Sequence, residues 1–432
     1  MSPDLCPLSP VSCPLALLDP EKQRWFAVEV VKQLRAHGYE SFWAGGCVRD
    51  ELLDRLPKDY DVATAALPAQ IREVFGKRNT LPIGAAFGVI TVLGPKGAGQ
   101  IDVATFREDL AYSDGRRPDE VRFSSPQADA LRRDFTINGM FYDPLSQQVI
   151  DFVGGREDLG RRVIRAIGNA RERFTEDKLR MLRAVRFAAA FDFALEEQTV
   201  AAVRAMAAEI TVVSAERIAA EMRQMLERPA RARAVELLQA TGLLSQILPE
   251  AADAESLQPR LQLLAALDRP SFPQAFAVLL GWPHGEELVA GVAERWRLSN
   301  KESNLALWLL AHGTALDNAA QQPWSRLQPV LVHSGARELV ALYQTAAKLA
   351  RAAQSDVDFC RQKLALPRAQ LNPPPLVTGE DLLAMGVPKG KLYSVLLSVA
   401  RAAQLDGVIG TSLEAKHFVQ ERWQRLNQER SQ

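Results

Sequence analysis

The sequence predicts an α+β fold, in which a head that combines a mixed sheet with helices is followed by an all-helical remainder. Between residues 21 and 150, apolar runs rich in β-branched residues alternate with helical segments. From about residue 170, the segments are rich in Ala, Leu, Arg and Glu and repeat with helical spacing. The chain has 432 residues, and single cores stop growing near ~250–300 residues, so we expect several domains.

Composition narrows the classes of function. The chain carries 52 basic and 52 acidic residues, so a basic surface for nucleic acid must be local. Its four cysteines lack zinc-type spacing and are too few for a disulfide framework, which fits a reducing compartment. The apolar stretches fall short of the ~20 residues of a membrane span, and residues 1–20 lack the basic start of a secretory signal. We therefore expect a cytoplasmic protein without a membrane partner.

The head is expected to centre on residues 43–64, WAGGCVRDELLDRLPKDYDVAT, after a first helix at 21–38. Apolar runs and turn residues predict four elements in order: a strand at 42–44, a turn at Gly45-Gly46, a helix at 48–53 and a second strand at 60–63. The order strand, glycine turn, helix and acidic strand is the framework for the candidate site.

Asp59 and Asp61 lie at the middle of this framework. Successive side chains of a strand point to opposite faces, so the two carboxylates share one face, with Cα atoms roughly 7 Å apart. Such a pair suits two Mg²⁺ ions at the ~3.5–4 Å spacing of two-metal phosphoryl transfer. The backbone of Gly45 and Gly46 suits a triphosphate at the helix start, and Arg49 stands one turn into the helix. Separately these features are common on protein surfaces; together they favour nucleotidyl transfer.

The remainder of the head adds a third acidic candidate and a long connection. Apolar runs at 89–93 and 101–106 predict a hairpin beside the Asp-x-Asp strand. Asp102 lies on its second strand, where a carboxylate needs a partner. We expect it in the metal site, the alternative being an Asp on an edge strand. Residues 108–131 predict a long functional loop with Asp114-Gly115 as a flexible point.

The motifs resemble a known family. The stretch 43–64, the run RRDFTINGMFYDP at 132–144 and DFVGGREDL at 151–159 resemble motifs of tRNA CCA-adding enzymes and related poly(A) polymerases of the bacterial and eukaryotic type. These enzymes belong to the polymerase β-like nucleotidyltransferase superfamily. The resemblance implies that Arg133 contacts the incoming nucleotide, and that Asp134 lies near the ribose or orients that arginine.

Residues 174–187, FTEDKLRMLRAVRF, predict a helix with Thr175 as its N-cap. Asp177 and Arg180 are spaced i, i+3 on one face, and such pairs are usually surface salt bridges. The pair also places a hydrogen-bond acceptor beside a donor, which matches the edges of cytosine and adenine but not those of uracil and guanine. The resemblance to the family's Glu-Asp-x-x-Arg motif implies this second role.

The same resemblance assigns further basic residues. Arg183 and Arg186 correspond to family arginines that contact the nucleotide. Residues 378–409 are similar to the tail segment of bacterial members, and a solvated lysine turn and helix face is the alternative reading. Three side chains of this tail are candidates for tRNA phosphates: Lys389, Lys391 and Arg401.

We expect five segments along the chain. In order they are a flexible N-terminal segment (1–20), the catalytic head (21–150), a helical neck with base recognition (151–255), a helical body (256–350) and a helical tail that binds tRNA (351–432). A stiff linker is expected at the prolines 373–375.

Together these features predict a Mg²⁺-dependent enzyme that adds C and A to the tRNA 3′ end from CTP and ATP, without a template and without a DNA partner. The loop at 108–131 is expected to govern the change from C to A, because adenine is larger than cytosine and one rigid pocket cannot hold both in one pose.

Four alternatives remain. An A-adding enzyme working with a separate CC-adding enzyme would use Asp177 and Arg180 equally well. A CC-adding enzyme is disfavoured because such relatives have a shortened loop before RRD. A poly(A) polymerase is disfavoured because those relatives tend to end in a strongly basic extension, unlike ERWQRLNQERSQ here. A catalytically dead RNA-binding protein would lack the metal carboxylates.

Overall fold

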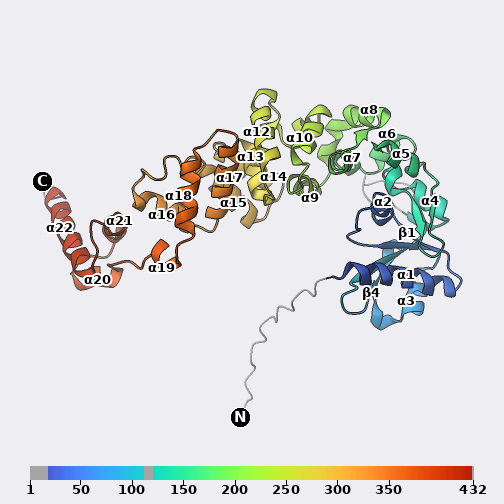
Figure 1. Ribbon diagram of the computed structural model, residues 1–432, viewed down its shortest axis with the longest axis horizontal. Coiled ribbons are helices and arrows are strands. Elements are labelled where there is room, and N and C mark those ends of the chain that lie inside the picture. The colour runs from blue at the N-terminus through green and yellow to red at the C-terminus, as the bar shows by residue number, and fades with distance from the viewer. Residues whose placement is uncertain (1–17, 111–119, 431–432) are drawn as a thin grey trace, which may run out of the picture. The chain divides into compact units, whose positions relative to one another are not determined.

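The computed structural model describes residues 18–110 and 120–430, and the chain divides into two compact units, one ending at Val213 and one beginning at Ser214. Every strand in the described part of the chain belongs to the first unit, and the second unit is helical there (Figure 1). This confirms the predicted fold class. The segment expected to be flexible, 1–20, lies outside the described residues up to residue 17.

A seven-stranded sheet with the order β3-β4-β5-β2-β1-β8-β9 forms the middle of the first unit. Its strands are β1 (Ser41–Ala44), β2 (Asp61–Thr64), β3 (Thr80–Gly84), β4 (Val89–Leu93), β5 (Gln100–Thr105), β8 (Phe141–Asp143) and β9 (Gln148–Ile150). β4 and β5 form the predicted antiparallel hairpin, and β5 pairs in parallel with β2. The hairpin therefore lies directly beside the strand of Asp61.

Helices flank this sheet, with α1 and α3 on one side of the strands and α2 and α4 on the other in Figure 1. Their bounds are α1 (Pro20–Ala36), α2 (Gly46–Leu52), α3 (Pro68–Phe75) and α4 (Pro126–Leu131). Trp43 of β1 donates its indole hydrogen to the carbonyl oxygen of Ala27 in α1 at 3.1 Å. The ring of Phe42 contacts Phe106 and Phe141 instead. β1 is thus buried on both faces, which explains the apolar run at its residues 42–44.

Within 108–131, the described residues 108–110 and 120–131 are mostly strand and helix, which differs from the loop that their composition predicts. β6 (Arg107–Leu110) and β7 (Glu120–Phe123) pair as an antiparallel hairpin, and α4 follows almost directly. The expected flexible point, Asp114-Gly115, lies outside the described residues. Backbone pairing and helix formation therefore occupy most of the described part of this segment, despite its Asp, Gly, Pro and Ser content.

The first unit continues with helices α5 (Gly155–Arg161), α6 (Ala170–Glu176), α7 (Leu179–Phe191) and α8 (Glu197–Met206). Two short strands, β10 (Val163–Ile164) and β11 (Ala194–Leu195), pair in parallel among them. β11 departs from the predicted all-helical character of the chain beyond about residue 170. The apolar side chains of α7, including Leu182 and Val185, are buried.

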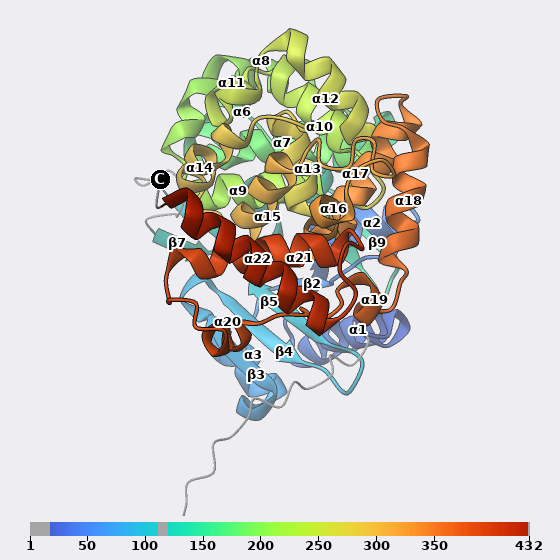
Figure 2. The ribbon, with the colours of Figure 1, turned by 90° about the vertical axis from the view of Figure 1, so that its left-hand side faces the viewer.

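The second unit consists of helices that follow one another along the chain. They are α9 (Ala215–Leu226), α10 (Arg231–Ala240), α11 (Leu243–Ile247), α12 (Ala254–Ala266), α13 (Phe272–Leu280), α14 (Glu286–Arg295), α15 (Asn300–Ala311), α16 (Trp324–Val332), α17 (Ala336–Lys348), α18 (Gln354–Leu364), α19 (Arg368–Leu371), α20 (Gly379–Ala384), α21 (Lys391–Leu405) and α22 (Ser412–Arg430). All nine residues of α13 are buried, as expected for a helix that is apolar all round and packs against α9, α12 and α15. α21 and α22 pack against each other near the C-terminal end (Figure 2).

Within the described ranges, none of the helices combines the length and the apolar character that crossing a bilayer requires.

Candidate active site

The candidate acidic residues meet where β2 lies beside β5. The parallel register places Asp61 opposite Asp102. β2 begins one residue later than predicted, so Asp59 precedes the strand instead of sharing one of its faces. The hydroxyl of Thr91, on β4, donates to Asp102 Oδ1 at 2.6 Å and fixes that carboxylate. Strand pairing thus brings together carboxylates that are about forty residues apart in the sequence.

The pKa of Asp61 reflects the negative charges gathered in this cluster. Its pKa is raised to about 6, first by desolvation among surrounding protein atoms and then by the negative charges of Asp59 and Asp102, while Arg133 acts in the opposite direction. The side chain nevertheless keeps an exposed surface, which leaves it accessible to a ligand. A cation would relieve this repulsion.

The oxygen donors of this cluster fit a hard divalent cation. Among residues 18–110 and 120–430, no three His, Cys, Asp or Glu side chains lie close enough to enclose a metal by themselves. Mg²⁺ in nucleotide sites commonly binds one or two carboxylates and takes its other oxygens from substrate phosphates and water. Asp59 and Asp61 match this type of open site.

Gly45 makes room for an arginine beside the acidic cluster. It is the N-cap residue of α2 with φ of 75°, a conformation that favours glycine. A Cβ at this position would lie only 2.9 Å from Nη1 of Arg133. The same Nη1 donates to the carbonyl oxygen of Asn138 at 3.3 Å, and the guanidinium lies over the ring of Phe141. Arg133 is therefore held at the glycine turn, where phosphates were predicted.

Asp129, which was not predicted from the sequence, holds this arginine and its neighbour. It is only 1% exposed, and its Oδ1 accepts two hydrogen bonds from Arg132 at 2.9 and 2.7 Å. Its Oδ2 accepts two from Arg133 at 3.2 and 2.9 Å. Burial acts to raise the pKa of Asp129, but Arg133 and Arg132 lower it overall. The three- and four-residue spacing is helical and was readable in the sequence, but α4 was not predicted.

Asn138 connects three of the predicted nucleotide-binding residues. Its Oδ1 accepts from Nη1 of Arg49 at 2.7 Å, and its amide donates to Asp134 Oδ1 at 3.2 Å, in addition to the contact with Arg133. Asp134 Oδ2 accepts two hydrogen bonds from Arg183 at 2.9 and 2.6 Å. Burial acts to raise the pKa of Asp134, and Arg183 is the largest cause of its net lowering. In these contacts Asp134 orients Arg183.

Arg49 is buried, with 8% of its surface exposed. Besides Asn138, it bonds to Asp50, and its guanidinium lies 4.4 Å from the ring centroid of Phe191 in α7. Arg49 therefore bridges α2 and α7. Asn138, which it contacts, also contacts Arg133. Gly46 adjoins it, since a Cβ there would lie 3.6 Å from Arg49 Nη2.

Residues 174–187 are not the single helix that was predicted. α6 ends at Glu176, Asp177 has an extended backbone (φ −148°, ψ 104°), and α7 begins at Leu179. Thr175 therefore lies in the last turn of α6, and its assignment as an N-cap is wrong. The carboxylate of Asp177 accepts the backbone N–H of Leu179 at 3.1 Å. Such local bonding offers the backbone an alternative to a continuous helix, which explains the break.

Arg180 is held rigidly at the start of α7, with 9% of its surface exposed. Its Nη1 donates to Glu176 Oε2 at 2.6 Å and to the carbonyl oxygen of Arg173 at 3.2 Å. Its Nη2 donates to the carbonyl oxygen of Arg132 at 3.2 Å, which links α7 to the segment that carries Arg132 and Arg133. Glu176 is a second positioning residue that was not predicted. Arg186 is also buried, with its guanidinium over the neighbouring Phe187 ring.

The predicted basic residues of the tail lie in the second unit and differ in their contacts. Lys389 and Lys391 are exposed. Arg401 donates to the carbonyl oxygen of Pro373 and to Asn372 Oδ1, both at 2.7 Å. Its guanidinium thus holds the proline linker.

Comparison with known proteins adds independent information. Residues 41–165 match the family model described as Poly A polymerase head domain, and residues 192–255 match the one described as probable RNA and SrmB-binding site of polymerase A. The CCA-adding enzyme of Lactiplantibacillus plantarum is 33% identical over 368 residues, which cover 82% of this chain and 87% of that protein.

The CCA-adding enzyme of Geobacillus stearothermophilus is 42% identical over 245 residues, covering 56% of this chain and 58% of that protein. The chain thus spans about half the length of several curated relatives that it matches. Among solved structures, the crystal structure of the Bacillus stearothermophilus CCA-adding enzyme in complex with CTP has a TM-score of 0.77 and 29% identity. The structural match covers 96% of this chain and 100% of the chain in that crystal structure.

Proposed function

Because the chain belongs to the family of CCA-adding enzymes, we propose that it adds C and A to the 3′ end of tRNA from CTP and ATP, without a nucleic acid template. The proposal is carried by the position of Arg133, which lies at the Gly45 turn and acts on the same carboxylate, Asp61, that Asp59 and Asp102 influence. Phosphoryl transfer needs acidic groups for a metal and positive donors for phosphates within reach of each other.

Mg²⁺ is the proposed metal, held by Asp59 and Asp61 with Asp102 as the third acidic group. When bound, it would lower the pKa of the tRNA 3′-hydroxyl and stabilise the leaving pyrophosphate. Thr91 keeps the Asp102 carboxylate in place. The chain's own contribution is to hold these carboxylates close together although their charges repel, so that a cation and phosphates complete the site.

The incoming nucleotide is proposed to lie between the glycine turn and α7. The backbone of Gly45 and Gly46 and the guanidinium of Arg133 would contact its phosphates. Four further residues support this arrangement or contact the nucleotide: Arg49, Asp134, Arg183 and Arg186.

Base choice is assigned to Asp177 and Arg180. An ionised Asp only accepts hydrogen bonds and an Arg only donates them. Cytosine and adenine present an amino donor beside a ring-nitrogen acceptor, so both fit the pair, whereas uracil and guanine place like against like. Arg180 has five N–H donors, and its contacts with Glu176 and with two carbonyl oxygens leave donors for a base.

The partner is proposed to be tRNA, with Lys389 and Lys391 as candidate contacts to its phosphates. We also propose a cytoplasmic location, since the buried thiols of Cys47 and Cys360 are free and fit a reducing compartment.

The decisive experiment offers the wild-type chain three tRNA transcripts: one lacking the tail, one ending in C and one ending in CC. CTP and ATP are supplied separately and together, with and without EDTA. Extension of all three transcripts in the presence of metal is expected. If only the CC-ended transcript is extended, and only by ATP, the chain is an A-adding enzyme. Long A tails on unrelated RNA would identify a poly(A) polymerase.

A further inference from the structure

Asp59 lies outside the strand pairs that hold the other two acidic residues. In the described part of the chain, β2 pairs with β1 and with β5 from Asp61 onward, and this register fixes Asp61 opposite Asp102. Asp59 comes two residues before the strand and is exposed. Since a metal ligand must be held in place to bind well, the contacts on either side of Asp59 decide whether it can share a cation with Asp61.

The residue that follows Asp59, Tyr60, is fixed by packing. It is 1% exposed, and its ring centroid lies 4.7 Å from that of Trp43 on β1. Trp43 is itself fully buried and donates to the carbonyl oxygen of Ala27 in α1. Aromatic pairs at this distance stabilise a core beyond the area that they bury. The backbone between Asp59 and Asp61 is therefore anchored to β1 and α1.

The hydroxyl of Tyr60 joins a charged network that connects the first two helices. It donates to Glu51 Oε1 of α2 at 3.2 Å, and the same oxygen accepts from Nε of Arg24 in α1 at 3.1 Å. The guanidinium carbon of Arg24 also lies 5.4 Å from the ring centroid of Trp43. A hydrogen bond to a charged acceptor is stronger than one between neutral groups. Glu51 thus ties the segment before β2 to α1 and α2.

The residue before Asp59 is held by a separate contact with α1. Gln23 is only 6% exposed, and its Nε2 donates to the carbonyl oxygen of Lys58 at 3.2 Å. A buried amide is costly to leave unpaired, so this contact selects one position for the backbone at Lys58. Asp59 thus lies between two anchored residues. Because the negative charges of Asp59 and Asp61 repel each other, an exposed Asp59 without these anchors would move away from Asp61.

We propose that Gln23, Glu51 and Tyr60 are positioning residues of the metal site, which hold Asp59 where it shares a cation with Asp61. None of the three side chains is proposed to touch the metal or the substrate. The inference rests on the proposed function in taking Asp59 and Asp61 as metal ligands. It adds how the chain places Asp59, the ligand that strand pairing does not fix.

The test measures metal binding directly. Mn²⁺ is titrated into the full chain without nucleotide or tRNA, and free Mn²⁺ is followed by electron paramagnetic resonance. Tyr60→Phe keeps the ring but removes the hydroxyl. It should weaken Mn²⁺ binding about fivefold, less than the ~10–100-fold loss typical when a group bonded directly to a metal ligand is removed. Gln23→Met, which is similar in size but lacks the donor, should act in the same direction.

Variants of Glu51 separate its acceptor from its charge. Glu51→Gln keeps an oxygen acceptor for Tyr60 and should bind Mn²⁺ within about twofold of wild type. Glu51→Leu removes the acceptor and should resemble Tyr60→Phe. A second readout is the Mg²⁺ concentration that gives half-maximal incorporation of CTP. It should rise in Tyr60→Phe, while the KM for CTP at saturating Mg²⁺ should stay within about twofold of wild type.

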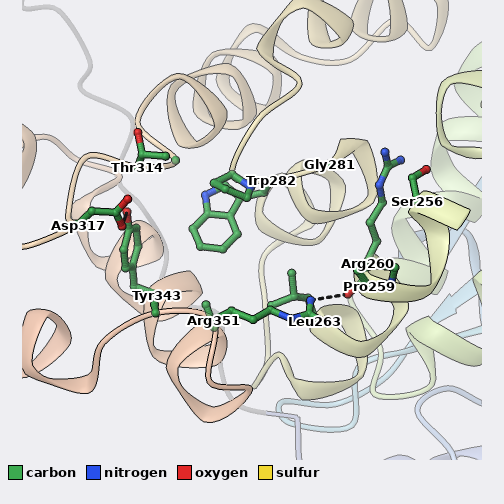
Figure 3. Close-up of a pocket in the computed structure, with 14 residues that line it drawn as sticks. Ser256, Pro259, Arg260, Leu263, Gly281, Trp282, Thr314, Asp317, Tyr343 and Arg351 are labelled. Atoms are coloured by element: carbon green, nitrogen blue, oxygen red, sulfur yellow. Dashed lines mark hydrogen bonds between the residues drawn. The ribbon is translucent and has the colours of Figure 1, made fainter.

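Tyr343→Phe is the matched control. Tyr343 is 2% exposed, and its hydroxyl donates to Asp317 Oδ1 at 2.8 Å in the second unit (Figure 3). This substitution removes the same group from a similarly buried tyrosine that also donates to a carboxylate. It should lower the thermal stability of the chain but leave Mn²⁺ affinity unchanged.

A folded Tyr60→Phe variant, verified by circular dichroism, that binds Mn²⁺ as tightly as wild type would overturn the inference. So would equal losses of Mn²⁺ affinity in Tyr60→Phe and Tyr343→Phe, which would mean only general destabilisation. Incorporation of CTP into tailless tRNA is measured in parallel on wild type. Wild type that binds Mn²⁺ but extends no tRNA would contradict the proposed function alone, because Mn²⁺ binding by Tyr60→Phe would still decide the inference.

Discussion

Asp129 and Asn138 fix the positions of the side chains that are proposed to bind the nucleotide. Asp129 accepts two hydrogen bonds from each of Arg132 and Arg133, and Asn138 contacts Arg49, Arg133 and Asp134. Neither residue is proposed to touch the substrate. A site whose arginines are held by buried acceptors keeps its geometry between one nucleotide and the next.

Asp129→Asn should therefore raise the KM for both CTP and ATP by about tenfold, because the amide cannot hold both arginines, while kcat falls less. The free energy of unfolding should fall by about 2 kcal/mol, since buried acceptors for charged groups are lost. Steady-state kinetics and urea unfolding measure the two effects. Asp54→Asn, at an exposed position of the same unit, is the control. A loss of stability with unchanged KM would mean that Asp129 has only a structural role.

Asp61 should make the metal-free chain less stable as the pH rises. Its pKa in the folded chain is about 6, above the usual value of 3.8, so the folded state binds the proton more tightly. This contribution to stability is complete below about pH 4 and is lost as the pH rises through 6. Asp61 should contribute about 1 kcal/mol to the free energy of unfolding, because water screens the exposed side chain. Metal affinity should weaken over the same window as the pH falls.

Thermal unfolding between pH 4.5 and 7.5, with and without Mg²⁺, measures both trends. Asp61→Asn should flatten the pH dependence and abolish incorporation of every nucleotide, while leaving tRNA binding intact. An unchanged pH profile in this variant would assign the titration to another group.

Arg180→Ala should relax base choice. The variant keeps the acceptor of Asp177 but loses the donor that opposes the N–H of uracil or guanine. UTP and GTP incorporation, relative to CTP and ATP, should rise by about tenfold or more. Glu176→Gln should give a smaller change in the same direction, because it loosens Arg180 without removing it. If both variants stay as selective as wild type, the ion pair between Arg180 and Glu176 has only a structural role.

At the level of helices and strands, periodicity predicted the helix at 21–38 and the strands at 89–93 and 101–106, because each has one burial pattern along its length. It missed the β6–β7 hairpin, whose polar residues satisfy their backbone hydrogen bonds by pairing with each other. It also missed the break at Asp177, where a side-chain hydrogen bond outweighs a continuous helical pattern.

The same limits apply to the candidate site. Asp61 and Asp102 were predicted together because neighbouring strands bring their residues together in a regular way. Asp129 and Glu176 were missed because each acts through a helix end whose position was not predicted. Side chains that bind a substrate are recognisable by their chemistry, whereas those that hold them depend on the local backbone.

The C-terminal helices give a prediction that separates support from RNA contact. Arg401→Gln should lower the thermal stability of the second unit, because Pro373 and Asn372 lose a donor. The double variant Lys389→Gln and Lys391→Gln should leave stability unchanged but weaken tRNA binding and reduce its salt dependence by about one to two phosphate contacts. Unfolding curves and binding at several salt concentrations test this. An unaffected salt dependence would place the tRNA elsewhere.

The two compact units divide the proposed work between them. The acidic cluster, Arg132 and Arg133, and the residues proposed to read the base all belong to the first unit, whereas the two lysines proposed to contact tRNA belong to the second. Each unit has its own buried core, including α13 in the second.

A fragment that ends at Val213 should therefore fold and bind CTP and ATP with affinities within about threefold of the full chain, because no proposed nucleotide contact lies beyond it. A fragment that begins at Ser214 should be helical and bind RNA but not nucleotides. Circular dichroism and equilibrium binding test both fragments. Nucleotide binding that requires the second unit would contradict this division.

The three acceptors around Arg180 also have a thermodynamic consequence. An arginine loses up to about 2 kcal/mol of rotamer entropy when it becomes immobile. Here Glu176 and the carbonyl oxygens of Arg173 and Arg132 already restrict it, so folding absorbs this loss once. Each nucleotide that binds afterwards contacts an Arg180 side chain that is already ordered, so binding costs no further rotamer entropy of this side chain. A nucleic acid template must bring a new base into position for every residue copied, but an ordered side chain can be reused without that step.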